Sequence, residues 1–195
     1  MSIHQRQEDL KSRIRLLGKK QRLAFAIWCA ERLFPNYVAF SSKVGWGESS
    51  VLRRALDLSW DTLLGKPPTP GVLEVVLGEC EAQVPSSDEF LCILTTPAQD
   101  AVFAICSVLD FLQSNDTEAV LRPSSYAIDS VDLYVQETEG LEAGDPRRES
   151  IIEEHPLMRA ELESQSGLLQ KMGVEDDPVH LVGPIRGTTP GNLGL

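Results

Sequence analysis

The sequence contains no stretch of apolar residues long enough to cross a membrane. A membrane-spanning helix needs about 20 consecutive, mainly apolar residues, and no part of this chain approaches that length. The short apolar run at 23–30 follows a basic start but continues directly into Glu31 and Arg32, which is not the pattern of a secretory signal. We therefore expect a cytoplasmic protein with no membrane association.

Cysteine and histidine are both scarce, and neither forms a metal-binding pattern. The four cysteines are Cys29, Cys80, Cys92 and Cys106, and the three histidines are His4, His155 and His180. No C-x-x-C pair occurs, so the cysteines are interpreted as small buried side chains in a reducing compartment. A helical bundle that holds two metals usually carries Glu-x-x-His pairs, and the chain has none. We expect neither a metal nor a cofactor.

The strong short motifs of enzymes are also missing. The chain has no G-x-S-x-G elbow, no Walker-type phosphate loop and no H-E-x-x-H. The segment Gly45-Trp46-Gly47-Glu48-Ser49 is similar to a phosphate-binding turn at the start of a helix, but it lacks the lysine of such a loop. It is interpreted as a hinge between helices, with Glu48 or Ser49 as the cap. No catalytic residue is assigned, and the sequence favours a protein that is not an enzyme.

Basic residues are too few for a general nucleic-acid binder. The formal net charge is -11, whereas contacts with phosphates require a surplus of Lys and Arg. Residues 1–66 carry twelve Lys and Arg against six Asp and Glu, and residues 67–195 carry six against twenty-three. The acidic half is suited to a basic partner, although a high net charge also serves solubility alone. Nucleic-acid binding would need one basic stripe formed by Arg13, Arg15, Lys19, Lys20 and Arg22.

What the chain does have is apolar residues at helical spacing. Its length of 195 residues and its apolar fraction of 42% are those of one globular domain. We predict an all-α protein, a single compact bundle of about seven or eight helices within residues 1–172. The segments with apolar residues three or four positions apart are 3–17, 19–34, 36–44, 48–64, 72–84, 97–112, 124–138 and 156–172. Of these, 72–84 could also be a strand, but its full length fits a helix better.

Prolines and glycines set the predicted boundaries. Pro35 is expected to end the second helix, because a proline has no N–H and restricts the residue before it. Asn36 is expected to cap the next helix, and Pro123 is expected at the entrance of a later one. Loops are predicted at 65–71 and 140–146. Residues 173–195 show no apolar stripe and are expected to form a flexible or loosely packed tail.

Several of these segments together resemble one known family. They are Glu31–Tyr37 (ERLFPNY), Phe40, Gly45-Trp46-Gly47, 52–63 (LRRALDLSWDTL), Val84–Asp88, Pro97-Ala98-x-Asp100-Ala101 and His155-Pro156. In combination they resemble the YjaG-like family, domain of unknown function 416, over roughly residues 5–172. The resemblance implies an all-helical bacterial protein and brings no established activity, cofactor or catalytic residue. The tail after Gly173 departs from the family pattern.

A polar cluster on the helix at 48–64 is the most suggestive arrangement. Arg53, Asp57 and Asp61 lie one turn apart on one face, and paired carboxylates perform acid–base chemistry when burial separates their pKa values. At this spacing, however, Arg and Asp also form ordinary surface pairs. If acidic residues of neighbouring helices reach the same face, the cluster becomes a buried polar network of structural or recognition character. The candidate residues are Glu31, Arg53, Arg54, Asp57, Asp61 and Asp100.

Four aromatic residues are expected to gather near Pro35: Tyr37, Phe40, Trp46 and Trp60. Packing in the core is the ordinary interpretation, because aromatic side chains bury large apolar areas. The alternative is an exposed aromatic groove that binds a partner.

Two functions follow as hypotheses. The leading one is a non-enzymatic helical interaction module that binds a basic protein through its acidic half, for example as an immunity-like inhibitor of a basic toxin. The alternative is an enzyme or small-ligand binder that uses Arg53, Asp57 and Asp61, which requires these side chains to line a concave pocket. The oligomeric state is left open, because an apolar stripe serves either a monomer core or a dimer interface.

Overall fold

The computed structural model of the chain describes residues 2–175, 177–187 and 190–195. Within these residues it contains helices and no strand, so the predicted all-α bundle is confirmed. The helices are α1 (Ile3–Leu16), α2 (Lys19–Val44), α3 (Ser49–Leu63), α4 (Val72–Glu81), α5 (Thr95–Ser114), α6 (Thr117–Thr138), α7 (Arg148–Glu154), α8 (Pro156–Met172) and α9 (Val179–Val182), followed by a 3-10 turn at Gly183–Ile185. In the described part of the chain, no helix is long and apolar enough to cross a bilayer.

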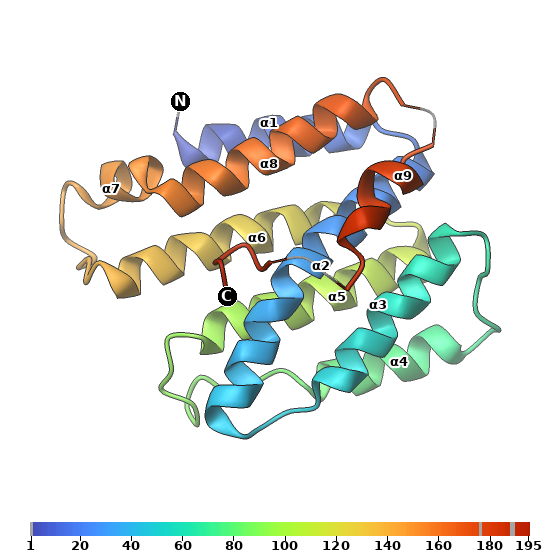
Figure 1. The fold of residues 1–195 in the computed structure, drawn as a ribbon, viewed down its shortest axis with the longest axis horizontal. Coiled ribbons are helices and arrows are strands. Elements are labelled where there is room, and N and C mark those ends of the chain that lie inside the picture. The colour runs from blue at the N-terminus through green and yellow to red at the C-terminus, as the bar shows by residue number, and fades with distance from the viewer. Residues whose placement is uncertain (1, 176, 188–189) are drawn as a thin grey trace.

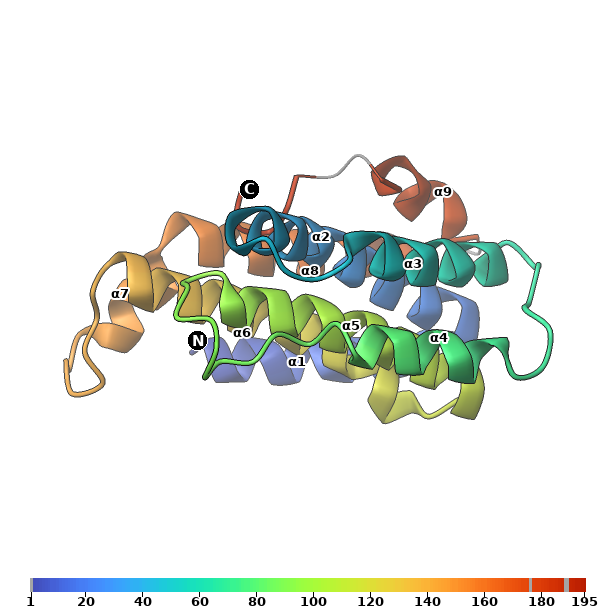
Figure 2. The ribbon, with the colours of Figure 1, turned by 90° about the horizontal axis from the view of Figure 1, so that it is seen from below.

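The helices form two layers. α8, α2 and α3 make the front layer, and α1, α6, α5 and α4 make the back layer (Figures 1 and 2). α2 crosses over α5 and α6, and α5 lies between α6 and α4 in its own layer. α9 lies on the outside of the front layer (Figure 2). The core therefore lies between the layers, with α2 and α5 at its centre.

The N-terminal half of α2 is buried on every side. All residues from Leu23 to Glu31 are buried, which is the pattern of a helix inside a protein rather than on its surface. The opposing helix α5 presents a stripe of small and branched side chains, and these are also buried. They are Ala98, Ala101, Val102, Ile105, Val108 and Leu109. The alanines of both helices allow their backbones to approach closely, and this contact places segment 97–112 at the centre of the fold.

The prediction that Pro35 ends a helix is wrong. α2 continues through Pro35, and Asn36, expected as an N-cap, is buried inside it. Pro35 removes one backbone donor from the helix, but buried side chains hold α2 on both sides of the proline. In addition, the backbone N–H of Asn192 in the C-terminal segment donates to the carbonyl of Arg32 at 3.0 Å. Tertiary contacts therefore carry one helix across a site where local rules predict two.

The prediction that Pro123 stands at a helix entrance is also wrong. α6 begins at Thr117, so Pro123 lies inside it. The side chain of Asp116 caps this start by accepting a hydrogen bond from a first-turn N–H at 3.0 Å. Val120 is fully buried one turn later, so packing as well as the cap holds the segment before the proline in the helix.

Three other segments complete the comparison with the predicted elements. Segment 72–84 forms the helix α4 and not a strand. The short helices α7 and α9 were not predicted, because each has a single buried residue, Ile152 in α7 and Val182 in α9. One buried residue produces no periodic pattern in a sequence.

The C-terminal segment contacts the bundle at Asn192 and Leu193, which are both buried. The Asn192 side chain accepts a hydrogen bond from Nδ2 of Asn36 at 2.9 Å and donates one to the carbonyl of Ala127 at 2.8 Å. It thus links α2 to α6. These contacts lie in the tail that the sequence predicts to be flexible or loosely packed, of which residues 176, 188 and 189 lie outside the described residues.

Candidate functional site

Glu31 of α2 is the centre of the predicted polar cluster. The residue is 2% exposed, and Arg53 of α3 donates to both of its carboxylate oxygens, at 2.8 and 2.7 Å. Trp60 of α3 donates from Nε1 to Oε1 at 2.6 Å. This two-pronged geometry is the one that a guanidinium and a carboxylate prefer. Burial by itself lowers the pKa of Arg53, but the bonds to Glu31 and Asp57 outweigh it and raise that pKa overall, so Arg53 is charged.

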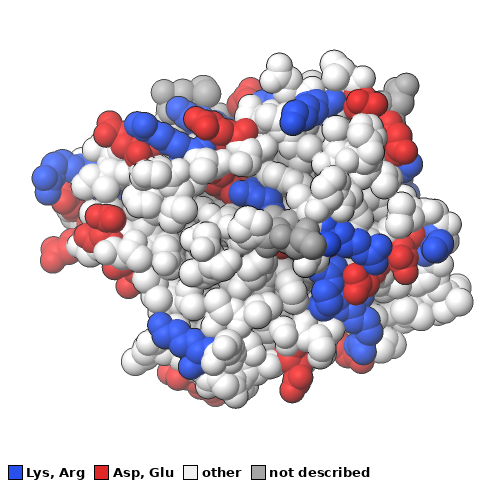
Figure 3. Space-filling view, in the orientation of Figure 1, with Lys and Arg blue, Asp and Glu red and all other residues white. Residues whose placement is uncertain are grey.

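Arg186 extends the cluster from the C-terminal segment. Asp57 accepts from Arg53 at 3.1 Å and from Arg186 at 3.2 Å, and Arg186 also lies 3.8 Å from Asp61. Asp57 and Asp61 are both about half exposed. Figure 3 shows basic and acidic side chains interleaved over α3 in the front layer. The sequence did not indicate Arg186, because it lies in a segment without periodicity and far along the chain from α3.

Two of the six predicted residues lie elsewhere. Arg54 is adjacent to Arg53 in the helix and therefore points about 100° away, toward Glu79 of α4, with which it pairs. Asp100 lies on α5 and accepts a hydrogen bond from Ser130 of α6 at 2.8 Å. Burial raises the pKa of Asp100 to about 7, although the bond from Ser130 acts in the opposite direction. Asp100 therefore belongs to the interface between α5 and α6, apart from the cluster.

A hollow of about 460 Å³ opens beside the Glu31–Arg53 pair. Its other lining residues are mostly apolar, namely Phe34, Pro35, Val38, Ala39, Ser42, Gly187 and Leu195. The guanidinium of Arg53 lies 5.6 Å from the centre of the Phe34 ring. Asp57 and Asp61 are not part of this lining. The hollow is large enough for a small molecule, but it does not bring together the three charged residues that the enzyme hypothesis requires.

Three of the four predicted aromatic residues form a cluster, and Trp60 is not among them. The Phe40 ring lies 6.2 Å from both Tyr37 and Trp46. Phe90, from the connection between α4 and α5, joins them at 5.4 Å from Phe40 and 5.3 Å from Trp46. Tyr37 and Phe40 are completely buried. Trp46 and Phe90 are partly buried and pack against the core, and Phe90 was not predicted.

The Gly45-Trp46-Gly47 turn is explained by backbone geometry. Both glycines have a positive φ, 68° at Gly45 and 86° at Gly47, and a Cβ at Gly47 would lie 2.2 Å from the Tyr37 hydroxyl. Glu48 starts α3, but its side chain makes no capping bond. Instead, Oε1 of Gln83 accepts from the Glu48 N–H at 2.8 Å and from the Tyr37 hydroxyl at 3.2 Å. The turn is a packed hinge in which Glu48 occupies the predicted cap position of α3 without a capping bond from its side chain.

A second buried ion pair was not predicted. Arg32 of α2 contacts both oxygens of Glu161 of α8, at 3.0 and 2.7 Å, and its guanidinium lies 4.4 Å from the centre of the Trp28 ring. Gln165 donates to Glu161 at 2.8 Å. A signal existed, because Glu161 and Gln165 occupy the apolar stripe of α8 one and two turns after Met158. Polar residues in an apolar stripe indicate a buried network.

The basic residues near the N-terminus contact other parts of the bundle. Arg13 donates to Ser166 of α8 at 2.8 Å, and Arg22 donates to Thr117 of α6 at 2.9 Å. Lys20 pairs with Asp177 at 3.0 Å. Arg15 pairs with Glu118 at 3.1 Å. These contacts fasten α1 and α2 to the rest of the bundle and leave the proposed basic stripe largely paired.

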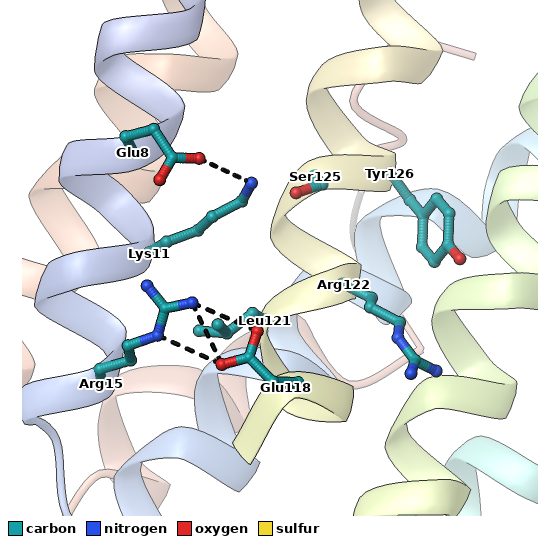
Figure 4. Close-up of a pocket in the computed structure, with 8 residues that line it drawn as sticks. All are labelled: Glu8, Lys11, Arg15, Glu118, Leu121, Arg122, Ser125 and Tyr126. Atoms are coloured by element: carbon teal, nitrogen blue, oxygen red, sulfur yellow. Dashed lines mark hydrogen bonds and ion pairs between the residues drawn. The ribbon is translucent and has the colours of Figure 1, made fainter. Parts of the chain in front are cut away.

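A shallow pocket of about 270 Å³ lies between α1 and α6 (Figure 4). Lys11 and Arg15 point from α1 toward α6, where Arg15 meets Glu118, while Lys11 bonds to Glu8 on its own helix at 2.9 Å. Tyr126 points toward α5. Arg122, which also lines the pocket, lies 3.6 Å from Asp110 of α5. The basic side chains of this pocket are therefore already paired with acidic ones, so it is not a free anion site.

Metal-binding groups are absent from the described residues: no three His, Cys, Asp or Glu side chains there gather closely enough to hold an ion. All four cysteines are free thiols. Burial raises the pKa of Cys29 and Cys106 strongly and that of Cys80 to about 12.

Comparison with known proteins identifies the family. The family described as "Protein of unknown function (DUF416)" matches residues 9–189, which extends past the residues on which the resemblance was based and into the tail. The uncharacterized protein YjaG of Escherichia coli strain K12 is 27% identical over 182 residues, or 92% of this chain and 90% of that protein. YjaG of Salmonella typhimurium strain LT2 is 25% identical with the same coverage. The crystal structure of a DUF416 family protein from Shewanella baltica OS155 superimposes with a TM-score of 0.83 at 26% identity, covering 95% of this chain and 97% of that chain. The chain therefore belongs to the DUF416 family of proteins of unknown function.

Proposed function

We propose that the protein is a non-enzymatic interaction module in the cytoplasm, and that it binds a basic partner protein through its acidic half. One observation carries this proposal. Residues 67–146 contain fifteen Asp and Glu but a single basic residue, Arg122. Of the fifteen acids, Asp100 is buried, and the others reach the surface at least in part. A surface with one sign of charge attracts a partner of the opposite sign and speeds their encounter.

The acidic segment is also continuous in space. Residues 67–146 form α4, α5 and α6 with their connections, and these three helices are neighbours in the back layer (Figure 2). Acidic side chains gather at the end of the bundle where α6 joins α7, on the left of Figure 3. The two arginines there are engaged locally, Arg147 with Asp145 at 3.2 Å and Arg148 with Gln136. Little positive charge is left to neutralise this end.

The contacts of the polar cluster support a structural role over a catalytic one. Both oxygens of Glu31 already accept hydrogen bonds from Arg53 or Trp60. Asp57 and Asp61 are half exposed and face Arg186. A catalytic acid or base needs a free position toward a substrate, and these carboxylates are occupied by arginines.

The proposal is tested by native mass spectrometry of the untagged protein enriched from its host at low salt. We expect a stoichiometric basic protein that is lost at high salt, because salt screens contacts between exposed charges. The double variant Glu139→Lys, Glu142→Lys should lose this partner. The control Glu163→Lys, Glu175→Lys changes the charge equally at an exposed and a partly exposed position outside residues 67–146 and should retain it. A protein that binds nothing at low salt, or a partner insensitive to salt, would refute the proposal.

A second candidate, small-ligand binding, is supported by the hollow beside Glu31 and Arg53. Its apolar walls and one charged side suit a small amphipathic molecule. Ala39 is part of the wall, so Ala39→Trp should fill the hollow. The candidate predicts that a small molecule is released when the wild-type protein is denatured for mass spectrometry and is missing from Ala39→Trp. Equal amounts of any such molecule from both proteins would reject this site.

A further inference from the structure

A groove of about 420 Å³ lies between the connection that precedes α5 and the C-terminal half of α6. We call it the 87–96 groove, because it is lined by residues between 87 and 96 together with Leu133 and Glu137 of α6. Its floor is held in place. The ring of Phe90 packs against Phe40 and Trp46, and the hydroxyl of Thr95 donates to the Phe90 carbonyl at 2.8 Å. The groove is thus formed before any partner binds.

The rim of the 87–96 groove exposes large apolar side chains. Leu91 is 96% exposed, more than any other large apolar residue in the described part of the chain, and Leu133 is 37% exposed. Single exposed apolar residues are common on protein surfaces, but exposed apolar residues that border a groove mark interaction sites. The partner should therefore contribute apolar side chains.

The charge around the groove has one sign. Glu137 lines it, no Lys or Arg does, and Asp88 and Glu89 are exposed in the same connection. The groove also lies inside residues 67–146, where Arg122 is the single basic residue. A partner segment that places Lys or Arg beside its apolar side chains matches both properties.

We propose that the 87–96 groove is the docking site for a basic amphipathic helix of a partner protein. This inference rests on the proposed function and names the surface and the partner segment. An amphipathic helix presents apolar side chains on one face at three- and four-residue spacing. The apolar side chains of the partner helix fill the groove between Leu91 and Leu133. The Lys or Arg residues that flank them on the partner helix pair with Glu137 and Glu89.

The probe for this proposal is a fluorescein-labelled helical peptide of about 16 residues with leucines on one face and lysines on the others. Its affinity is measured by fluorescence anisotropy at low and high salt. Leu91→Ser and Glu137→Lys should each weaken binding by about tenfold, the first by loss of apolar burial and the second by charge repulsion. Both residues are exposed, so the variants should fold, which circular dichroism verifies.

The matched controls lie outside the groove. Leu64→Ser removes another exposed leucine and Glu163→Lys reverses another exposed acid, and both should keep the wild-type affinity within about twofold. A second readout uses Cys92, the thiol that lines the groove. Bound peptide should slow alkylation of Cys92 by iodoacetamide by about fivefold or more, as read by peptide mapping.

The outcomes separate this inference from the proposed function. If the lysine peptide binds in a salt-sensitive manner but the groove variants and the controls behave alike, the groove assignment is wrong and the proposed function stands. If a matched peptide with glutamates in place of the lysines binds equally well, both are refuted. Loss of affinity in the two groove variants together with protection of Cys92 supports both.

Discussion

Replacing Arg53 with methionine is the most direct test of how the front layer is held together. Methionine keeps much of the side-chain volume but removes every hydrogen bond that Arg53 makes to Glu31 and Asp57. The carboxylate of Glu31 then remains buried, with Trp60 as its donor at 2.6 Å. The substitution thus removes the ion pair between α2 and α3 without opening a large cavity.

The expected magnitude follows from burial. Removing one partner of a buried ion pair costs about 3–5 kcal/mol, because the other charge is left uncompensated. The Arg53 side chain is 25% exposed, and Trp60 keeps one bond to Glu31, so we expect a smaller loss of about 2–3 kcal/mol in the free energy of unfolding. For a chain of this size, that loss lowers Tm by roughly 4–12 °C.

The assay is guanidinium unfolding followed by circular dichroism, with a neighbouring control. Arg54→Met removes the exposed pair with Glu79 and should change stability by less than about 1 kcal/mol. The double variant Glu31→Met, Arg53→Met removes both charges, and we expect it to recover at least about 1 kcal/mol relative to Arg53→Met alone. A loss below about 1 kcal/mol in Arg53→Met, or additive losses in the double variant, would refute the reasoning.

Three further predictions concern other parts of the fold. Burial raises the pKa of Asp100 to about 7 in the folded protein. Between about pH 4 and pH 7, the folded state therefore holds a proton that the unfolded state has released. The contribution of Asp100 to the free energy of unfolding is therefore fully present below about pH 4 and is lost as the pH rises toward about 7. Asp100→Asn should weaken this dependence of stability on pH, measured by urea unfolding at several pH values, and an unchanged dependence would contradict the assignment. Gly47→Ala should lower the free energy of unfolding by about 2–4 kcal/mol in chemical denaturation, because φ is positive there and the new Cβ would meet the Tyr37 hydroxyl. Gly45→Ala, whose Cβ would have no atom within 4 Å, should lower it by about 1 kcal/mol, and equal effects of the two variants would rule out the clash. Asn192→Ala should lower the free energy of unfolding by about 1–3 kcal/mol in thermal melts, because its partners on α2 and α6 lose their hydrogen bonds. An unchanged Tm would instead support the prediction from the sequence that the tail is flexible or loosely packed.

Much of the fold could be predicted because helical periodicity is a local property. Leu52, Ala55, Leu56 and Leu63 of α3 are all buried, and their spacing alone places them on one face. The helical segments 19–34 and 97–112, which lie within α2 and α5, were identified for the same reason. The continuation of α2 through Pro35 and of α6 through Pro123 could not be predicted, because the free energy that carries a helix through a proline comes from packing against other helices.

The candidate site was predictable only where its residues lie on one helix. Arg53 and Asp57 are four positions apart, so helical geometry brings them together. Their partnership with Arg186 depends on the path of the C-terminal segment, and no pattern near Arg186 reports that path. Asp100 was grouped with this cluster by sequence, but α5 turns it toward Ser130 of α6 instead.

The sequence by itself determined that the protein is all-helical, where most helices lie, and that its charge is divided into a basic start and an acidic remainder. These properties depend on residue type and on spacing within a single helix. The tertiary structure alone decided which charges meet, as in the pairs of Glu31 with Arg53 and of Arg32 with Glu161. It also decided that Leu91 stands exposed beside a groove. Such contacts join residues far apart in the chain, and their existence depends on how the layers pack rather than on any local preference.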